Sequence, residues 1–168
     1  MKLLPPKSGS GRQIEMWMQQ VSAEITRINF SLARAYLSAD TVINHIAEDK
    51  ILLDVENFDL GNNFGSYKYT APITGYYQVN AAVLYYDVHG KLYLATMTVR
   101  KNGVICSSAP YWAGVDKTWV GTSVNDIVYL TAGQYLELFG YVQTTDSSSA
   151  VIYGGSAYTF MSVHLIST

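Results

Sequence analysis

Apolar and polar positions alternate along the segment from Tyr67 to Tyr86, and this alternation predicts two strands joined by a turn. The first strand covers Tyr67–Thr70, and a Pro/Gly turn at 71–75 separates it from a longer second strand. Successive side chains of a strand point to opposite faces, so the second strand has one dry face and one wetter face. The dry face carries Tyr77, Val79, Ala81, Val83 and Tyr85, and the wetter face carries Tyr76, Gln78, Asn80, Ala82, Leu84 and Tyr86.

From about residue 34 onward, the rest of the chain also alternates between short predicted strands and turns. Short alternating runs are separated by turn signals such as GNNFG at 61–65, NG at 102–103, AG at 132–133 and GGS at 154–156. Eight to ten strands with regular turns predict an all-β sandwich, jelly roll or barrel. The predicted strands are Arg34–Thr41, Lys50–Val55, Tyr67–Thr70, Gly75–Asp87, Lys91–Lys101, Thr118–Leu130, Gln134–Gln143, Ala150–Tyr153 and Tyr158–Ile166.

The N-terminal part follows a different period. Apolar residues recur there with alternating spacings of four and three, which predicts a helix over 13–33 with one apolar seam. Residues 1–12 are rich in Pro, Gly and Ser and are interpreted as a flexible tether. The seam consists of Ile14, Met18, Val21, Ile25, Ile28 and Leu32.

Two interpretations of this helix are open: it docks on its own domain, or it forms a short coiled coil between chains. The strict heptad spacing favours the coiled coil, because the tether offers no second helix for the seam to pack against. β-branched residues at the d-type positions Ile14, Val21 and Ile28 and at the a-type position Ile25 favour three or four strands over two.

Composition narrows the class of protein. The chain has 168 residues, a formal net charge of −2 and only 14% charged residues, so it lacks the basic surface of a nucleic-acid or anionic-membrane binder. Cys106 is the single cysteine, which excludes an intrachain disulfide and a thiolate metal cluster. The N-terminus has no apolar signal region, and no run of about 18 apolar residues predicts a membrane span.

Five motifs, in this order, resemble the C1q/tumour-necrosis-factor-like (C1q/TNF-like) jelly roll. They are FDLGNNF at 58–64, YTAPITGYYQVNAAV at 69–83, VRKNGV at 99–104, VYLTAGQYLEL at 128–138 and YGGSAYTFMSVHLI at 153–166. The resemblance covers residues 34–168, the predicted head, and implies a homotrimer packed around a threefold axis. The residues that match the family pattern are Pro72, Gly75, Tyr77, Asn102, Gly103, Gly133, Gly155 and Phe160. We interpret them as fold residues: glycines at tight turns, proline presetting a turn, and Phe160 entering the core of the last strand.

A tether, a short coiled coil and a C1q-like head resemble the small fibre and adhesin proteins of tailed bacteriophages. The resemblance implies a virion protein made in the host cytoplasm, with the N-terminal segment docked on another virion protein. Its head would then bind a host-surface glycan or protein. The alternatives are a purely structural capsid or tail decoration fibre without a receptor, and a bacterial C1q-like surface protein.

The sequence contains no pattern that predicts an enzyme, since it lacks a phosphate loop, a metalloprotease helix and a nucleophile elbow. His45, His89 and His164 fall in separate elements without metal-ligand spacing, so no cofactor is expected. An acidic run could hold an apical calcium, as in some members of the family, but a solvated acidic edge is the better interpretation. This run consists of Glu48, Asp49, Asp54, Glu56 and Asp59.

Receptor contacts are expected on loops. The segment 107–119 is interpreted as a loop whose aromatic residues either stack on a sugar or protein partner or plug a barrel end or the subunit interface. The topology of the family also places loops around Asn44–Asp49, Asp87–Lys91 and Gly154–Ser156 at the end of the head opposite the chain termini. The candidate receptor contacts are His45, His89, Tyr111, Trp112 and Trp119.

Overall fold

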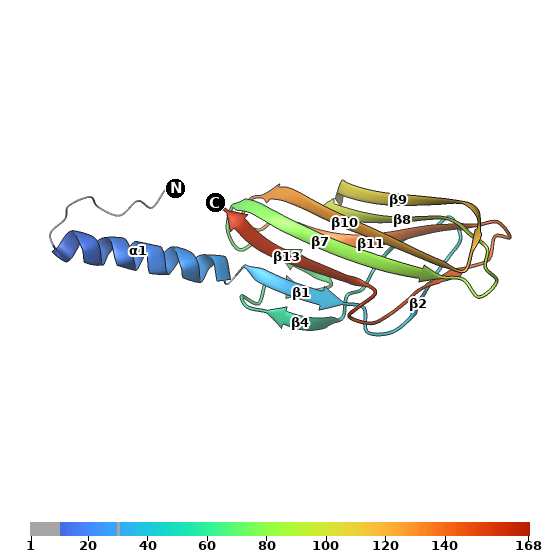
Figure 1. Ribbon diagram of the computed structural model, residues 1–168, viewed down its shortest axis with the longest axis horizontal. Helices are drawn as coiled ribbons and strands as arrows, with labels where there is room; N and C mark the ends of the chain where they lie inside the picture. The colour runs from blue at the N-terminus through green and yellow to red at the C-terminus, as the bar shows by residue number, and fades with distance from the viewer. Residues whose placement is uncertain (1–10, 30) are drawn as a thin grey trace.

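The computed structural model describes residues 11–29 and 31–168, and for residues 24 and 26–29 it describes the backbone only. One helix precedes a β-rich head (Figure 1). The elements are α1 Gly11–Asn29, β1 Leu32–Tyr36, β2 Thr41–Ile43, β3 Glu48–Lys50, β4 Val55–Asp59, β5 Phe64–Gly65, β6 Lys68–Thr70, β7 Gly75–Tyr86, β8 Leu92–Lys101, β9 Val104–Lys117, β10 Trp119–Leu130, β11 Tyr135–Thr144, β12 Ala150–Ile152 and β13 Phe160–Ser167.

The strands form two antiparallel sheets that pack face to face. The first sheet has the order β2-β12-β7-β13-β1-β4, and β10 pairs with the other edge of β7. The second sheet has the order β5-β6-β11-β8-β9, and β3 also pairs with β11. In the part of the chain that the structure describes, β9 pairs only with β8 and β10 only with β7, so both are edge strands.

The core lies between the sheets and follows the predicted alternation. On β7 every second residue from Tyr77 to Tyr85 is buried, which confirms the dry face expected from the pattern. Two buried tyrosines of this face use their hydroxyl groups inside the protein. The Tyr77 hydroxyl donates to the carbonyl of Ile73 at 2.6 Å, and the Tyr85 hydroxyl donates to the carbonyl of Thr96 at 2.8 Å. Burial raises the pKa of Tyr85, so its hydroxyl stays protonated and can keep donating.

Glycine and asparagine shape the turns at the positions where the backbone requires them. Asn102 and Gly103 have positive φ angles of 50° and 82° and form the two-residue hairpin between β8 and β9. Gly75, at the start of β7, faces the carbonyl oxygen of Ser167 so closely that a Cβ atom there would clash with it. Gly133 and Gly155 also have positive φ angles, while Pro72 is exposed in the turn before β7.

The helix begins earlier and ends earlier than predicted. α1 includes Gly11 and Arg12, which the composition assigns to the tether, and it ends at Asn29. Residues 1–10 lie outside the described part of the chain. The assignment of Leu32 to the helical seam is wrong, because Leu32 opens β1 and pairs with His164 of β13. The backbone hydrogen bonds gained by that pairing end the heptad pattern before its last position.

One strand prediction and one loop prediction are also wrong. Residues 51–54 do not continue a strand from Lys50, because the chain crosses there from the second sheet to the first. The Ile51 amide donates to the Leu138 carbonyl at 2.8 Å, and the Asp54 amide donates to the Tyr36 carbonyl at 3.1 Å. The predicted loop 107–119 is largely strand β9, which the hairpin at 102–103 pairs with β8.

Phe160 does not enter the core as predicted. It opens β13 on the outer face of the first sheet, where the guanidinium carbon of Arg34 lies 4.2 Å from its ring centroid. The next residue, Met161, is the buried one. β13 begins two positions after the predicted start at Tyr158, and its inward-facing set is Met161, Val163 and Leu165, so the alternation places Phe160 on the opposite face.

Candidate functional site

Four parts of the surface carry the residues that could bind a partner. They are the seam of α1, the outer face of the first sheet, the edge formed by β9 and β10, and the end of the head farthest from α1. We call the last one the distal end and define it as residues 87–91, 113–118 and 145–149. It lies opposite α1 and the C-terminus (Figure 1).

The seam of α1 is largely open to solvent. Ile14, Met18 and Ile25 are 44%, 53% and 55% exposed, and Val21 is half-buried. The principal contact of the helix with the head is made with β13, and α1 projects away from the sandwich (Figure 1). The structure therefore does not show the helix docked along its own domain, which was one of the two interpretations of its apolar seam.

The outer face of the first sheet carries aromatic residues at both ends of β7. Tyr76 packs against Tyr129 near the helix end, with ring centroids 5.1 Å apart. Trp119 packs against Tyr86 at 4.3 Å and against Tyr153 at 5.3 Å toward the other end. Between them lie several polar side chains, together with the apolar residues Ala82, Leu84 and Ile127. This polar band, as we call it, consists of Gln78, Asn80, Asn125, Ser162 and His164.

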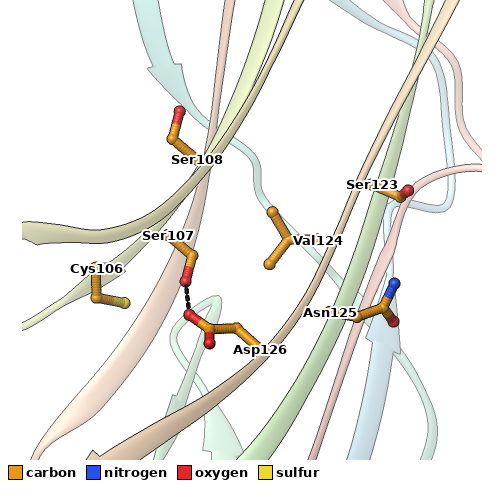
Figure 2. A pocket seen from close by; sticks show the side chains of 7 residues that line it. All are labelled: Cys106, Ser107, Ser108, Ser123, Val124, Asn125 and Asp126. Carbon is orange, nitrogen blue, oxygen red and sulfur yellow. Dashed lines mark hydrogen bonds between the residues drawn. The ribbon is translucent and has the colours of Figure 1, made fainter.

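The β9–β10 edge contains a polar pocket of about 390 Å³ (Figure 2). The Ser107 hydroxyl from β9 donates to the Asp126 carboxylate from β10, and the same carboxylate accepts the Ile127 amide at 2.7 Å. Cys106 lies beside them, and burial followed by the charge of Asp126 raises the pKa of its thiol, so the thiol is protonated and weakly nucleophilic. The pocket also contains Ser108, Ser123 and Asn125.

At the distal end the turn from β7 to β8 is held by a buried carboxylate. Asp87 accepts the amides of His89 at 3.0 Å and of Lys91 at 2.6 Å. The amide of Asp87 itself donates to the Thr118 carbonyl at 2.9 Å, which joins this turn to the start of β10. An aspartate that caps its own turn in this way fixes the backbone that carries His89.

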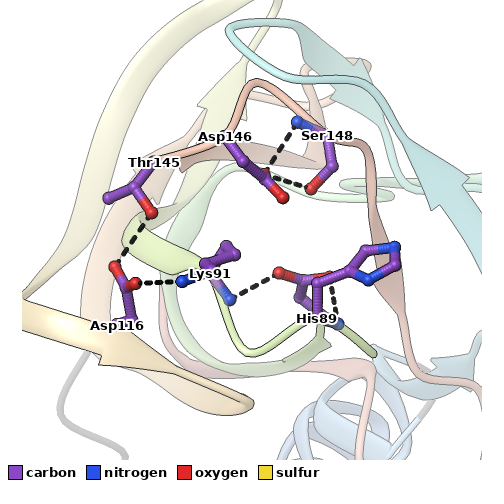
Figure 3. A network of polar contacts seen from close by, with 7 residues as sticks. His89, Lys91, Asp116, Thr145, Asp146 and Ser148 are labelled. Carbon is purple, nitrogen blue, oxygen red and sulfur yellow. Dashed lines mark hydrogen bonds and ion pairs between the residues drawn. The ribbon is translucent and has the colours of Figure 1, made fainter.

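Three side chains connect the distal loops, and we call them the distal clasp: Lys91, Asp116 and Thr145 (Figure 3). The Lys91 ammonium lies 2.9 Å from the Asp116 carboxylate, and the Thr145 hydroxyl donates to that carboxylate at 2.9 Å. The hydrogen bond from Lys91 lowers the pKa of Asp116, and Asp116 raises the pKa of Lys91. An exposed ion pair contributes little to global stability, so we interpret the clasp as ordering the loops.

The predicted receptor contacts separate into different places. His89 is exposed in the distal turn. His45 is half-buried, and its Nδ1 atom accepts the Thr144 amide at 3.1 Å, so it anchors the segment after β2 to β11. Tyr111 lies on the β9 edge.

The two tryptophans fall on opposite faces of the sandwich. Trp112 pairs with Leu94 on the outer face of the second sheet, is 63% exposed, and packs edge-on against Tyr93 at 5.7 Å. Trp119 belongs to the aromatic group on the first sheet. Between Trp112 and Lys117 the strand β9 bulges, with Gly114 at a φ of +67°, and this bulge carries Asp116 to the clasp.

The acidic run does not come together as one ligand set. Glu48 pairs with Arg100 at 2.5 Å, Asp54 accepts the Ser38 amide and hydroxyl, and Asp59 accepts the Phe64 amide at 2.6 Å. Among the residues that the structure describes, no group of three or more His, Cys, Asp or Glu side chains could hold a metal ion. The described helix is not long and apolar enough to cross a membrane.

No protein-family profile and no curated protein sequence matches the chain. Solved structures of the same architecture do. Murine APRIL at pH 8.0 aligns with a TM-score of 0.62 and 13% identity over 81% of this chain and 98% of that chain. Eiger TNF from S. frugiperda aligns with a TM-score of 0.56 and 10% identity over 82% and 93%.

The globular domain of the zebrafish complement 1qA protein aligns with a TM-score of 0.55 and 9% identity over 81% of this chain and 97% of that chain. The head therefore has the C1q/TNF-like jelly-roll fold, which confirms the fold predicted from the five motifs. Identities of 9–13% show the fold alone.

Proposed function

We propose that three copies of this chain form an appendage of a bacteriophage particle, with the distal end of the head presented to a host-surface glycan or protein. The observation that carries the proposal is the exposed seam of α1, which continues along the long axis of the head. An isolated helix of 19 residues is marginally stable in water, so a parallel coiled coil supplies the partner that it needs.

The head offers surfaces suited to the same assembly. Two long edge strands, β9 and β10, lie side by side, and exposed edges of this length attract pairing unless another surface covers them. The outer face of the first sheet carries half-exposed aromatic residues, which favour burial in an interface. A ring of three requires two different patches to meet, and an edge packed on a face meets that requirement.

Geometry favours the distal end for receptor contact. α1 and the C-terminus occupy the opposite end, and we propose that residues 1–12 dock on the particle there. Within the proposed trimer Trp119 contributes to the covered face, while Trp112 and His89 stay accessible. Trp112 offers an aromatic surface on which a sugar ring or an apolar side chain can pack.

The oligomeric state is the first test. Light scattering on the full chain should give a mass near three times 18.6 kDa. Replacing Ile25 by Asp places a charge in the seam and should dissociate the trimer. The matched control is Ala23→Asp, which adds the same charge at an exposed helix position facing away from the seam and should leave the trimer intact. A monomeric wild-type protein would refute the proposed assembly.

Receptor binding and the virion role need separate tests. Labelled trimer is titrated onto a panel of bacterial strains, and saturable binding that Trp112→Ala weakens supports the receptor role. A trimer that binds no strain would contradict the receptor role and favour a decoration fibre without a receptor. Immunogold labelling of particles released from cells that carry the gene tests the virion role, and particles without label would contradict it. Deleting residues 1–12 should then abolish incorporation and leave the trimer intact.

A further inference from the structure

The pocket at the β9–β10 edge contains more hydrogen-bonding capacity than the single chain uses. The Asp126 carboxylate accepts the Ser107 hydroxyl and the Ile127 amide. An ionised carboxylate has about four acceptor positions, so acceptor capacity remains. The carboxylate lies in a pocket that opens at the edge of the sandwich rather than in the core (Figure 2).

The outer face of the first sheet contains a complementary group. The His164 side chain is half-buried on this face, and no hydrogen bond joins its ring to any other residue that the structure describes. Ser162 lies two residues earlier on the same strand, and among the described residues its hydroxyl makes one long contact, 3.5 Å to the Asn80 carbonyl. Imidazole N–H and hydroxyl groups are donors, whereas the edge pocket presents an acceptor that carries a negative charge.

The register of the sheet places the donor and acceptor groups at the same height along the head. Asp126 pairs with Val79, and Val79 pairs with Val163, so Asp126 lies level with the midpoint between Ser162 and His164. The strands β7, β10 and β13 run along the long axis of the head, and α1 continues in that direction (Figure 1). A parallel coiled coil of α1 would therefore set the rotation axis along the head, and rotation about that axis keeps the height of every residue.

We propose that Asp126 of one copy accepts hydrogen bonds from the Ser162–His164 row of the neighbouring copy. This inference rests on the proposed trimer. The partner surface is a second copy of this chain, and the contact joins an acidic edge to a donor-bearing face. Above and below it the same face is aromatic or aliphatic, so the contact is a polar layer in a mainly apolar interface. Such a layer fixes the vertical register of the subunits, because a sliding shift would leave the carboxylate buried in the interface with only its partners from its own chain, Ser107 and Ile127.

Cross-linking tests the predicted neighbours directly. The only cysteine is removed by Cys106→Ser, and Asp126→Cys and His164→Cys are introduced together into the full chain. A short bismaleimide should then join the chains into covalent dimers and trimers on a denaturing gel. Only links between copies change the mass, so a link within one chain does not mimic the result.

The matched control pair is Asp126→Cys with Leu84→Cys. Leu84 lies on the same outer face but five residues along β7 from the row of Asp126, about 17 Å away along the strand. This pair should give no covalent oligomers. Cross-linking of the control and not of the His164 pair would overturn the inference, as would an absence of cross-linking from a preparation that light scattering shows to be trimeric.

A functional readout of the same contact is subunit exchange. Asp126→Ala should accelerate exchange between differently labelled trimers by about tenfold or more, the effect expected for losing a hydrogen bond to a charged group. Asp49→Ala, which removes an exposed carboxylate from β3 on the second sheet, should leave exchange unchanged. Equal exchange rates for the wild-type and Asp126→Ala trimers would refute the polar layer. A wild-type protein that is monomeric would instead refute the trimer itself.

Discussion

The packing beneath the distal end can be tested with a double-mutant cycle between β7 and β11. Gly140 is buried on β11, and a Cβ atom there would lie 3.1 Å from the Tyr85 hydroxyl oxygen, 3.2 Å from Ile152 Cδ1 and 3.4 Å from Ile43 Cδ1. All three distances are at or below the closest ordinary contacts, and the neighbours belong to three different strands. Gly140→Ala therefore overpacks the core at a point where no single neighbour can move aside freely.

The expected cost follows from two opposing contributions. Overpacking by one methyl group costs about 1–3 kcal/mol. Removing the flexibility of glycine from the unfolded chain offsets about 0.4–1 kcal/mol of this. We therefore expect Gly140→Ala to lower the free energy of unfolding by about 1–2 kcal/mol. Tyr85→Phe loses the hydrogen bond to the Thr96 carbonyl and should cost about 1 kcal/mol.

The double mutant is expected to lose less than the sum of the two. Tyr85→Phe removes the oxygen atom that lies closest to the new methyl group, so part of the overpacking is relieved. The coupling energy should be about 0.5–1 kcal/mol, within the range for residues in contact. Urea unfolding followed by tryptophan fluorescence measures all four proteins, at one protein concentration because the proposed assembly would make apparent stability concentration-dependent.

A matched control separates packing from the general effect of replacing glycine. Gly65 lies on β5 without a positive φ angle, and a Cβ atom added there would have no neighbour within 4 Å. Gly65→Ala should be neutral or slightly stabilising. If Gly140→Ala is equally harmless, or if the two core substitutions add within about 0.3 kcal/mol, the contact between the Tyr85 hydroxyl and the Gly140 site is not as close as described.

Three further predictions concern the surface. Trp119→Ala removes contacts with two aromatic rings and should destabilise the protein by about 1–3 kcal/mol, whereas Trp112→Ala removes one such contact and should cost about 0.5–1.5 kcal/mol in urea unfolding. Because Lys91 lowers the pKa of Asp116, the stabilisation that this carboxylate contributes is present above a pH of about 3.8 and is lost as the pH falls through the pKa of the folded protein. NMR titration of the Asp116 carboxyl carbon should give a midpoint below pH 3.8. A midpoint at or above pH 3.8 would contradict the clasp. Gly103→Ala places a side chain at a φ of +82° and should cost about 1–2 kcal/mol, and an unchanged unfolding midpoint would show that the hairpin can change its turn type.

Local periodicity predicts much of this fold because the strands that it identifies are regular. The β7 strand alternates without interruption from Gly75 to Tyr86, and its buried set matches the pattern residue by residue. The NG turn at 102–103 also predicts its hairpin correctly, since both residues adopt the positive φ angles that this turn requires. In these segments the local pattern and the final structure agree.

The errors fall where non-local pairing overrides a local pattern. Leu32 continues the heptad spacing of the helix, yet pairing with β13 places it in a strand. Strand β9 contains Pro110 and Gly114 and a wide bulge, so its sequence is similar to a loop even though β8 pairs with most of its length. Ile51 and Leu53 alternate like strand residues and are buried, but they lie where the chain crosses between sheets.

The distal clasp could not be predicted from sequence for a related reason. Lys91 and Asp116 are 25 residues apart, and Thr145 is a further 29 residues along the chain. Their contact depends on the β9 bulge, which the sequence pattern does not reveal. The buried Asp87 is different, because an aspartate followed three residues later by glycine is a local turn signal that identifies the residue holding the β7–β8 turn.

The two tryptophans show why the binding surface can be located from the structure but not from the composition. Trp112 and Trp119 are seven residues apart and chemically identical, but the β9 bulge and the passage from β9 to β10 place them on opposite faces of the sandwich. If the outer face of the first sheet is the subunit interface, Trp119 is removed from the receptor-binding candidates and Trp112 is kept. The same substitution at the two positions should therefore separate the two roles: Trp119→Ala should weaken assembly, and Trp112→Ala should weaken cell binding by an intact trimer.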